Sequence, residues 1–133
     1  MCLVLLQSRV LVCTPSNSAA DLIVERLPPN WTEIMHRMMA YSRHPRHHSD
    51  AVKRFCNPVT AGGGEHFAPT ELKQLLTKRV VVATCMTAGV LYALGVGDDF
   101  FTHIIIDEVQ HLLVVFACRR SNELSSCAGR PLH

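Results

Sequence analysis

The chain has 133 residues, of which 48% are hydrophobic and 18% are charged. This composition excludes wholesale disorder, and the length suffices for one domain with a real hydrophobic core. The net charge of +2 is compatible with a nucleic-acid partner but does not require one. Six cysteines form no Cys-x-x-Cys pair and several fall within apolar runs, which favours free thiols of a reducing compartment over a disulfide framework.

The chain begins with a short apolar segment, Met1 to Leu6, that Arg9 soon interrupts. Because no basic segment precedes it, we interpret it as a strand and not as a signal peptide. No stretch of the sequence is long enough to span a bilayer. We therefore expect a cytoplasmic protein without a membrane partner.

Unbroken apolar runs alternate with segments of helical periodicity along the next hundred residues. We expect strands over Arg9 to Thr14, Arg79 to Thr84 and Phe101 to Asp107. We expect helices after the turn and cap residues Pro15-Ser16-Asn17-Ser18 to about Leu27, from Pro69 to Lys78 and from Thr87 to Leu94. Strands that are apolar on both faces and alternate with helices indicate βαβ units and a parallel sheet. The predicted fold class is therefore α/β.

Two segments are less clear. Glu33 to Tyr41 fits either a helix or a short strand, and Ser42 to His66 is polar, basic and glycine-rich without periodicity, so we expect an irregular excursion there. After Glu108 the stretch Leu112 to Ala117 is apolar, but residues 118–133 form a low-information tail. We place one domain over residues 1–117.

Each of the three clearest strands ends in polar residues. The three ends read Thr14-Pro15-Ser16-Asn17-Ser18, Thr84-Cys85-Met86-Thr87 and Asp107-Glu108-Val109-Gln110. The carboxyl ends of parallel strands meet at one edge, so these hydroxyls, the amide and the two acids should converge there. For any single Ser, Thr or Asn, capping a helix is the more common role, and only the recurrence at successive strand ends favours a binding site.

The two acids after an apolar strand have the form of a Walker B element. Asp107 offers a hard oxygen ligand suited to Mg²⁺, and Glu108 is placed to act on a water molecule. Gln110 is a candidate to sense a γ-phosphate or the attacking water. The alternative is a core strand followed by an acidic helix start. The hydroxyls and Asn17 suit phosphate oxygens of a ligand or of a nucleic-acid backbone.

Three sequence segments closely resemble motifs of superfamily 1 helicases of the Upf-like group, and most closely those of the Armitage-type RNA helicases of RNA silencing. Residues 10–21 (Val10-Leu11-Val12-Cys13-Thr14-Pro15-Ser16-Asn17-Ser18-Ala19-Ala20-Asp21) resemble motif Ia, residues 82–89 resemble the next motif, and residues 101–108 resemble motif II. The resemblance covers about Arg9 to His111, and the motif Ia match is the most specific part of it.

This resemblance implies the first RecA-like (P-loop NTPase) domain of an ATP-dependent RNA helicase that moves on single-stranded RNA. It implies that Asp107 holds the Mg²⁺ bound to ATP, that Glu108 activates water, and that Gln110 assists catalysis. The RNA backbone would contact the residues at the other two strand ends: Pro15, Ser16, Asn17, Ser18, Thr84 and Thr87. RNA-silencing proteins as partners and a place in ribonucleoprotein granules are further expectations.

The sequence also departs from this family's pattern. No Gly-x-x-x-x-Gly-Lys-[Ser/Thr] motif occurs, and Gly62-Gly63-Gly64 is followed by Glu65-His66, so we interpret it as a flexible turn. We therefore expect a helicase fragment that does not hydrolyse ATP alone, because its phosphate ligands are missing. The alternatives are a non-catalytic RNA-binding or interaction module with helicase architecture, and a DNA helicase of the same superfamily.

Overall fold

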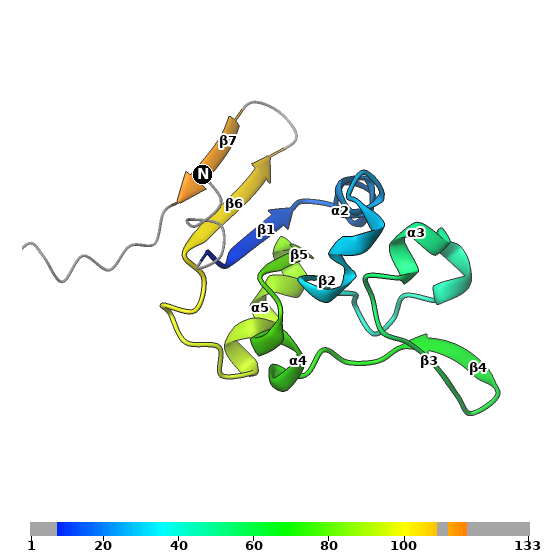
Figure 1. The fold of residues 1–133 in the computed structure, drawn as a ribbon. Coiled ribbons are helices and arrows are strands. Elements are labelled where there is room, and N and C mark those ends of the chain that lie inside the picture. The colour runs from blue at the N-terminus through cyan, green and yellow to red at the C-terminus, as the bar shows by residue number, and fades with distance from the viewer. Residues whose placement is uncertain (1–7, 109–111, 117–133) are drawn as a thin grey trace, which may run out of the picture.

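A computed structural model describes residues 8–108 and 112–116. Its main sheet has five strands in the order β2-β5-β1-β6-β7. The strands are β1 (Val10–Thr14), β2 (Met35–Arg37), β5 (Val80–Thr84), β6 (His103–Glu108) and β7 (Leu112–Phe116). The first four strands in that order are parallel, and β7 pairs antiparallel with β6 at the edge. Figure 1 shows β1 beside β6 and β6 beside β7, with β7 at the edge of the sheet.

The α/β class predicted from the sequence is therefore confirmed, and its parallel sheet with flanking helices agrees with a RecA-like arrangement. The three expected strands appear as β1, β5 and β6. The segment that fitted either a helix or a strand contains the short strand β2, preceded by a 3-10 helix, η1 (Pro29–Glu33).

The helices are α2 (Asn17–Glu25), α3 (Asp50–Lys53), α4 (Leu72–Thr77) and α5 (Cys85–Ala93). The expected ends of three of them shift by a few residues. The first helix stops at Glu25, before Leu27, and α5 begins at Cys85, because the Thr84 side chain caps it there.

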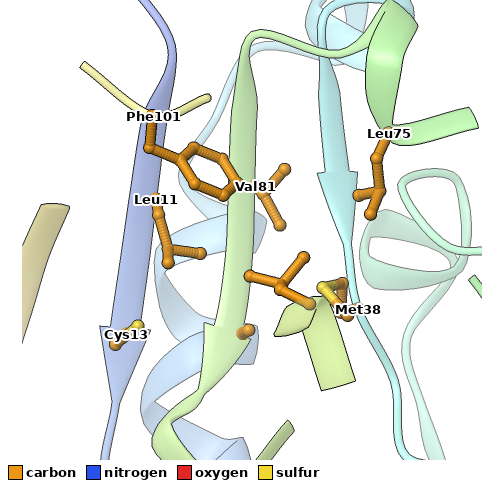
Figure 2. Packing of buried hydrophobic residues seen from close by; sticks show 8 residues of the cluster. Leu11, Cys13, Met38, Leu75, Val81 and Phe101 are labelled. Atoms are coloured by element: carbon orange, nitrogen blue, oxygen red, sulfur yellow. The ribbon is translucent and has the colours of Figure 1, made fainter. Parts of the chain in front are cut away.

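Alternate residues of the central strands pack on opposite faces of the sheet, as strand geometry requires. On one face, Leu11, Cys13 and Val81 belong to one buried cluster with Leu75 of α4 and Phe101 (Figure 2). On the other face, the side chain of Val82 packs with residues of α2 and with other buried side chains (Ala20, Val24, Met35 and Phe55). The sheet is thus covered on both sides, which explains why its strands read as continuous apolar runs.

The expectation of an irregular excursion over 42–66 is wrong in part. The region contains a 3-10 turn, η2 (Pro45–His47), the short helix α3, and a hairpin of β3 (Pro58–Ala61) and β4 (Gly64–Phe67). Gly62 and Gly63 form the two-residue hairpin loop with φ of 59° and 83°. Two positive φ values are the requirement of a type I′ turn, so the glycine run forms a tight turn.

The cysteines within the described residues are free, as expected: Cys13 and Cys56 are buried and Cys85 is exposed. Burial raises the pKa of Cys13 to about 11 and that of Cys56 to about 12, so both remain thiols at neutral pH. The strand expected over 1–6 and the tail over 118–133 lie outside the described residues. Within residues 8–108 and 112–116, no helix has both the length and the apolar character needed to cross a membrane.

Candidate nucleic-acid interface

The polar ends of the three strands meet at one edge of the sheet. Thr14 at the end of β1 pairs directly with Thr84 at the end of β5. On the other side of β1, Cys13 pairs with Ile106, and Asp107 is the next residue of β6. The sequence-based expectation that these strand ends lie together is therefore met in the geometry of the sheet.

The first polar segment forms the start of α2. Ser16 is the N-cap, and its Oγ accepts a hydrogen bond from the Ala19 N–H at 3.1 Å. This bond uses the hydroxyl as an acceptor and leaves its hydrogen available for a ligand. Pro15, Ser16 and Ser18 are exposed, whereas Asn17 is half-buried at the first helical position.

The second polar segment contains a pair of hydroxyls. Thr84 Oγ1 accepts the Thr87 N–H at 3.1 Å and thereby caps α5, and it lies 2.5 Å from Thr87 Oγ1. One hydroxyl of the pair therefore donates to the other. Either hydroxyl can be the donor of this pair, and when Thr84 donates, the Thr87 O–H is available to a ligand.

A cavity of about 520 Å³ opens beside these groups. This volume is in the range of small-molecule sites. Its lining brings together four of the six residues predicted to contact RNA, namely Pro15, Asn17, Thr84 and Thr87; Ser16 and Ser18 are not part of it. The remaining lining residues are Met38, Met39, Ala40, Tyr41, Pro69, Thr70, Met86, Val90 and Leu94.

The mostly apolar wall of this cavity was not predicted from the sequence. It includes Tyr41 and Met86, whose exposures of 74% and 89% are high for large apolar side chains. Tyr41 lies four residues after the end of β2, in the segment of ambiguous pattern. The signal available in the sequence was an aromatic residue that no helical or strand periodicity required.

A buried arginine behind the cavity was also missed. Arg37, the last residue of β2, has a fully buried side chain. Its guanidinium donates to Asp21 Oδ1 at 3.0 Å, to the Met38 carbonyl at 2.5 Å and to Asn17 Oδ1 at 3.1 Å. An arginine among the large apolar residues Ile34, Met35, Met38 and Met39 was the sequence signal for it.

Asp21 is the counter-charge of this cluster. Besides Arg37, its carboxylate faces Arg43 at 3.8 Å and His48 Nδ1 at 3.2 Å. Burial lowers the pKa of His48 although Asp21 opposes that shift, so the ring is neutral at pH 7 and donates Nδ1–H to the carboxylate. Burial likewise lowers the pKa of Arg37, but an arginine starts so high that it stays charged.

Asp107 is half-buried at the end of β6, and it does not line the cavity. The end of β1 lies between Asp107 and the cavity, because β1 separates β6 from β5 in the sheet. Within the described residues, no group of three or more His, Cys, Asp or Glu side chains is arranged to hold a metal. The Asp107 carboxylate fits Mg²⁺ held mainly by water and phosphate oxygens, which is this ion's usual coordination with nucleotides.

The other two residues predicted near the nucleotide are not tested by this geometry. The backbone of Glu108 ends β6, but its side chain lies outside what the structure describes, as does Gln110.

Comparison with known proteins decides the family. The chain is 36% identical over 104 residues to the mouse RNA helicase Mov10l1 and 33% identical over 105 residues to the chicken putative helicase MOV-10. It is 31% identical over 108 residues to a human probable helicase with zinc finger domain. These matches cover 76%, 78% and 77% of the chain. The chain belongs to the Mov10-like RNA helicase family.

The match covers 8% of the mouse relative, 11% of the chicken relative and 6% of the human relative, so the chain spans a small part of each relative's length. No family model matches the chain, and no solved structure matches it. The helicase family that the sequence resembles is thus confirmed by these relatives.

Proposed function

We propose that this chain carries the single-stranded RNA-binding edge and the magnesium-nucleotide acid of an ATP-dependent Mov10-like helicase. The observation that supports it is the cavity at the carboxyl edge of the sheet, in which Asn17 and Thr87 offer uncharged donors. Such donors suit phosphate oxygens, and contacts to phosphate position a strand without reading its sequence. The names of the relatives, which include RNA helicase, support RNA as the polymer.

The apolar wall supports a single strand over a duplex. Unpaired bases expose their faces, and proteins bind them by stacking on aromatic side chains beside a backbone-binding groove. Tyr41 and Met86 provide such exposed surfaces at the wall of the same cavity. We propose that the backbone follows Asn17 and Thr87 while a base packs on Tyr41.

We propose that Asp107 holds the Mg²⁺ of bound ATP, with Glu108 and Gln110 acting on the attacking water. The position of Asp107, one residue beyond a strand pair in the middle of the sheet, supports this role. Because the sequence holds no phosphate-binding Gly-Lys loop, we propose that the chain does not turn over ATP unaided. From the family we also propose that the intact protein works in the cytoplasm with RNA-silencing proteins.

The test is a fluorescence-anisotropy titration of the 133-residue chain with a labelled single-stranded RNA, the matching single-stranded DNA and an RNA duplex, each at several salt concentrations. We expect the single-stranded RNA to bind most tightly, with an affinity that falls as salt rises to the extent that Lys and Arg side chains neutralise phosphates. Equal binding of RNA and DNA would favour a DNA helicase segment, and no binding to any of them would refute the proposal.

Tyr41→Ala should weaken binding of single-stranded RNA roughly tenfold, since stacking of a base on an aromatic ring contributes about 1–3 kcal/mol. Tyr92→Ala is the matched control: Tyr92 on α5 is 88% exposed but does not line the cavity. An equal loss in both variants would show that no base stacks on Tyr41. Steady ATP turnover by the wild-type chain in the presence of RNA would contradict its proposed inactivity.

A further inference from the structure

The bond between Arg37 and Asn17 settles which way the Asn17 amide points. The oxygen and nitrogen of an amide side chain have nearly the same shape, so their positions must be assigned from the hydrogen-bond partners. A guanidinium carries donors and no acceptor. The atom 3.1 Å from Arg37 Nη2 must therefore be the Asn17 oxygen.

This orientation leaves the Asn17 NH₂ group without a role in the fold. Within residues 8–108 and 112–116, no hydrogen-bond partner faces Asn17 Nδ2. Asn17 lines the cavity described above, and its oxygen is held by the arginine behind it. The NH₂ group is the other arm of the planar amide, so it is the arm left to face a ligand.

Arg37 is itself fixed from several sides. Its Nε and Nη2 both contact Asp21 Oδ1 at 3.0 Å, and its Nη1 donates to the Met38 carbonyl. Its side chain is fully buried, so a change of position would break these bonds with no water to replace them. The guanidinium is thus a rigid donor that holds the Asn17 amide in one orientation.

We propose that Arg37 is a positioning residue that turns the Asn17 NH₂ toward the cavity, where it donates to a phosphate oxygen of single-stranded RNA. The inference rests on the proposed function, since it names how the RNA backbone is gripped there. An amide held in this way offers only donors, so it selects an acceptor such as phosphate oxygen and rejects a cation. Asp21 acts indirectly, because it binds Arg37 and so keeps the guanidinium in place.

Asn17→Asp is the sharpest variant because it preserves the shape of the side chain. A carboxylate still accepts from Arg37, and a negative charge at the start of α2 is favourable, so the melting temperature should not fall. The variant loses the N–H donors and places a negative charge near the phosphate. We expect its dissociation constant for a labelled single-stranded RNA to rise at least tenfold.

Asn30→Asp is the matched control, since it makes the same change of charge at an exposed residue of η1 that does not line the cavity. We expect it to change the dissociation constant less than twofold. Equal weakening by both variants would assign the effect to net charge and overturn the inference.

The role of Arg37 is tested by a double-mutant cycle with Arg37→Lys. The lysine ammonium keeps the positive charge opposite Asp21. It lacks the several N–H donors of the guanidinium that reach Asn17, Asp21 and the Met38 carbonyl together. We expect Arg37→Lys to weaken RNA binding, and Asn17→Asp to weaken it further by much less in that background. Additive effects would mean that Arg37 supports the fold only, and would overturn the positioning role.

A nuclear magnetic resonance measurement of the free protein gives a second readout. The side-chain NH₂ signals of Asn17 are identified by their loss in Asn17→Asp, and RNA should shift them in the wild type. A wild type that binds RNA without moving these signals would overturn this inference alone. A wild type that binds no RNA would overturn the proposed function and this inference with it.

Discussion

His36 shows how a single buried side chain couples this fold to pH. The residue is 3% exposed on β2, and its Nε2 lies 2.9 Å from Thr70 Oγ1. Its Nδ1 lies 3.4 Å from Gln74 Nε2, so both ring nitrogens have a polar neighbour in the fold. Burial, assisted by the charge of Lys78, lowers the pKa of His36 to about 4.

Because the folded state binds this proton less readily than the unfolded chain does, stability falls as the solution becomes acidic. The stabilisation that depends on a neutral His36 is fully present above about pH 6.5 and is lost as pH falls through about 4. This loss lowers the free energy of unfolding by about 3 kcal/mol. We therefore expect His36→Gln to show a smaller loss of stability between pH 7 and pH 4.5 than the wild type, in urea unfolding at both pH values.

The control for this prediction is His47→Gln, at an exposed histidine of η2. It should leave the pH dependence as in the wild type. If His36→Gln instead loses as much stability over that range as the wild type does, His36 does not carry the effect.

At the scale of elements, the hairpin of β3 and β4 depends on its two-glycine loop. The sequence indicated a turn at Gly62 and Gly63 but not the strands on either side, because Pro58 to Phe67 has few of the apolar alternations that mark a strand. Tertiary contacts supply what the pattern lacks. Phe67 at the end of β4 is buried against Met39 and Val52.

Gly63→Ala should destabilise the protein by about 1–2 kcal/mol, because a side chain at its φ of 83° is in the left-handed region that L-residues avoid. No atom lies within 4 Å of a Cβ built at Gly63, so the cost comes from the backbone alone. Thermal unfolding followed by circular dichroism measures the change.

Gly89→Ala is the paired control, since Gly89 lies inside α5 without a positive φ and also has open space around it. There the same substitution should stabilise the protein by roughly 0.5–1 kcal/mol, because alanine favours a helix. Changes of the same sign at both glycines would refute the backbone explanation.

At the scale of the whole molecule, stability depends on helices that cover both faces of the parallel sheet. Leu75 of α4 is fully buried against Val81 and Met38 on one of these faces (Figure 2). Its neighbour Leu76 is 49% exposed. Two adjacent leucines of one helix therefore separate the effect of burial from that of residue type.

Leu75→Ala should lower the free energy of unfolding by about 2–5 kcal/mol, through lost apolar burial and the cavity that remains. Leu76→Ala should change it by less than about 1 kcal/mol, as is usual at the surface. Urea denaturation of both variants checks this, and losses of equal size would show that α4 does not pack on the sheet as described.

The sequence by itself determined the class of the fold and the edge at which the polar residues gather. Continuous apolar runs at β1, β5 and β6 require burial on both faces, and parallel strands bring their carboxyl ends to one edge, so Thr14, Thr84 and Asp107 had to meet. These conclusions depend on local pattern and on geometry that every parallel sheet shares.

Only the tertiary structure decided which polar groups cap a helix and which face a ligand. Thr84 and Thr87 both line the cavity, but Thr84 also caps α5, and the orientation of the Asn17 amide depends on Arg37, twenty residues away along the chain. Such roles follow from distances between side chains that are far apart in the chain. Local periodicity cannot predict those distances, because they depend on the pairing of β2 with β5 in the folded sheet.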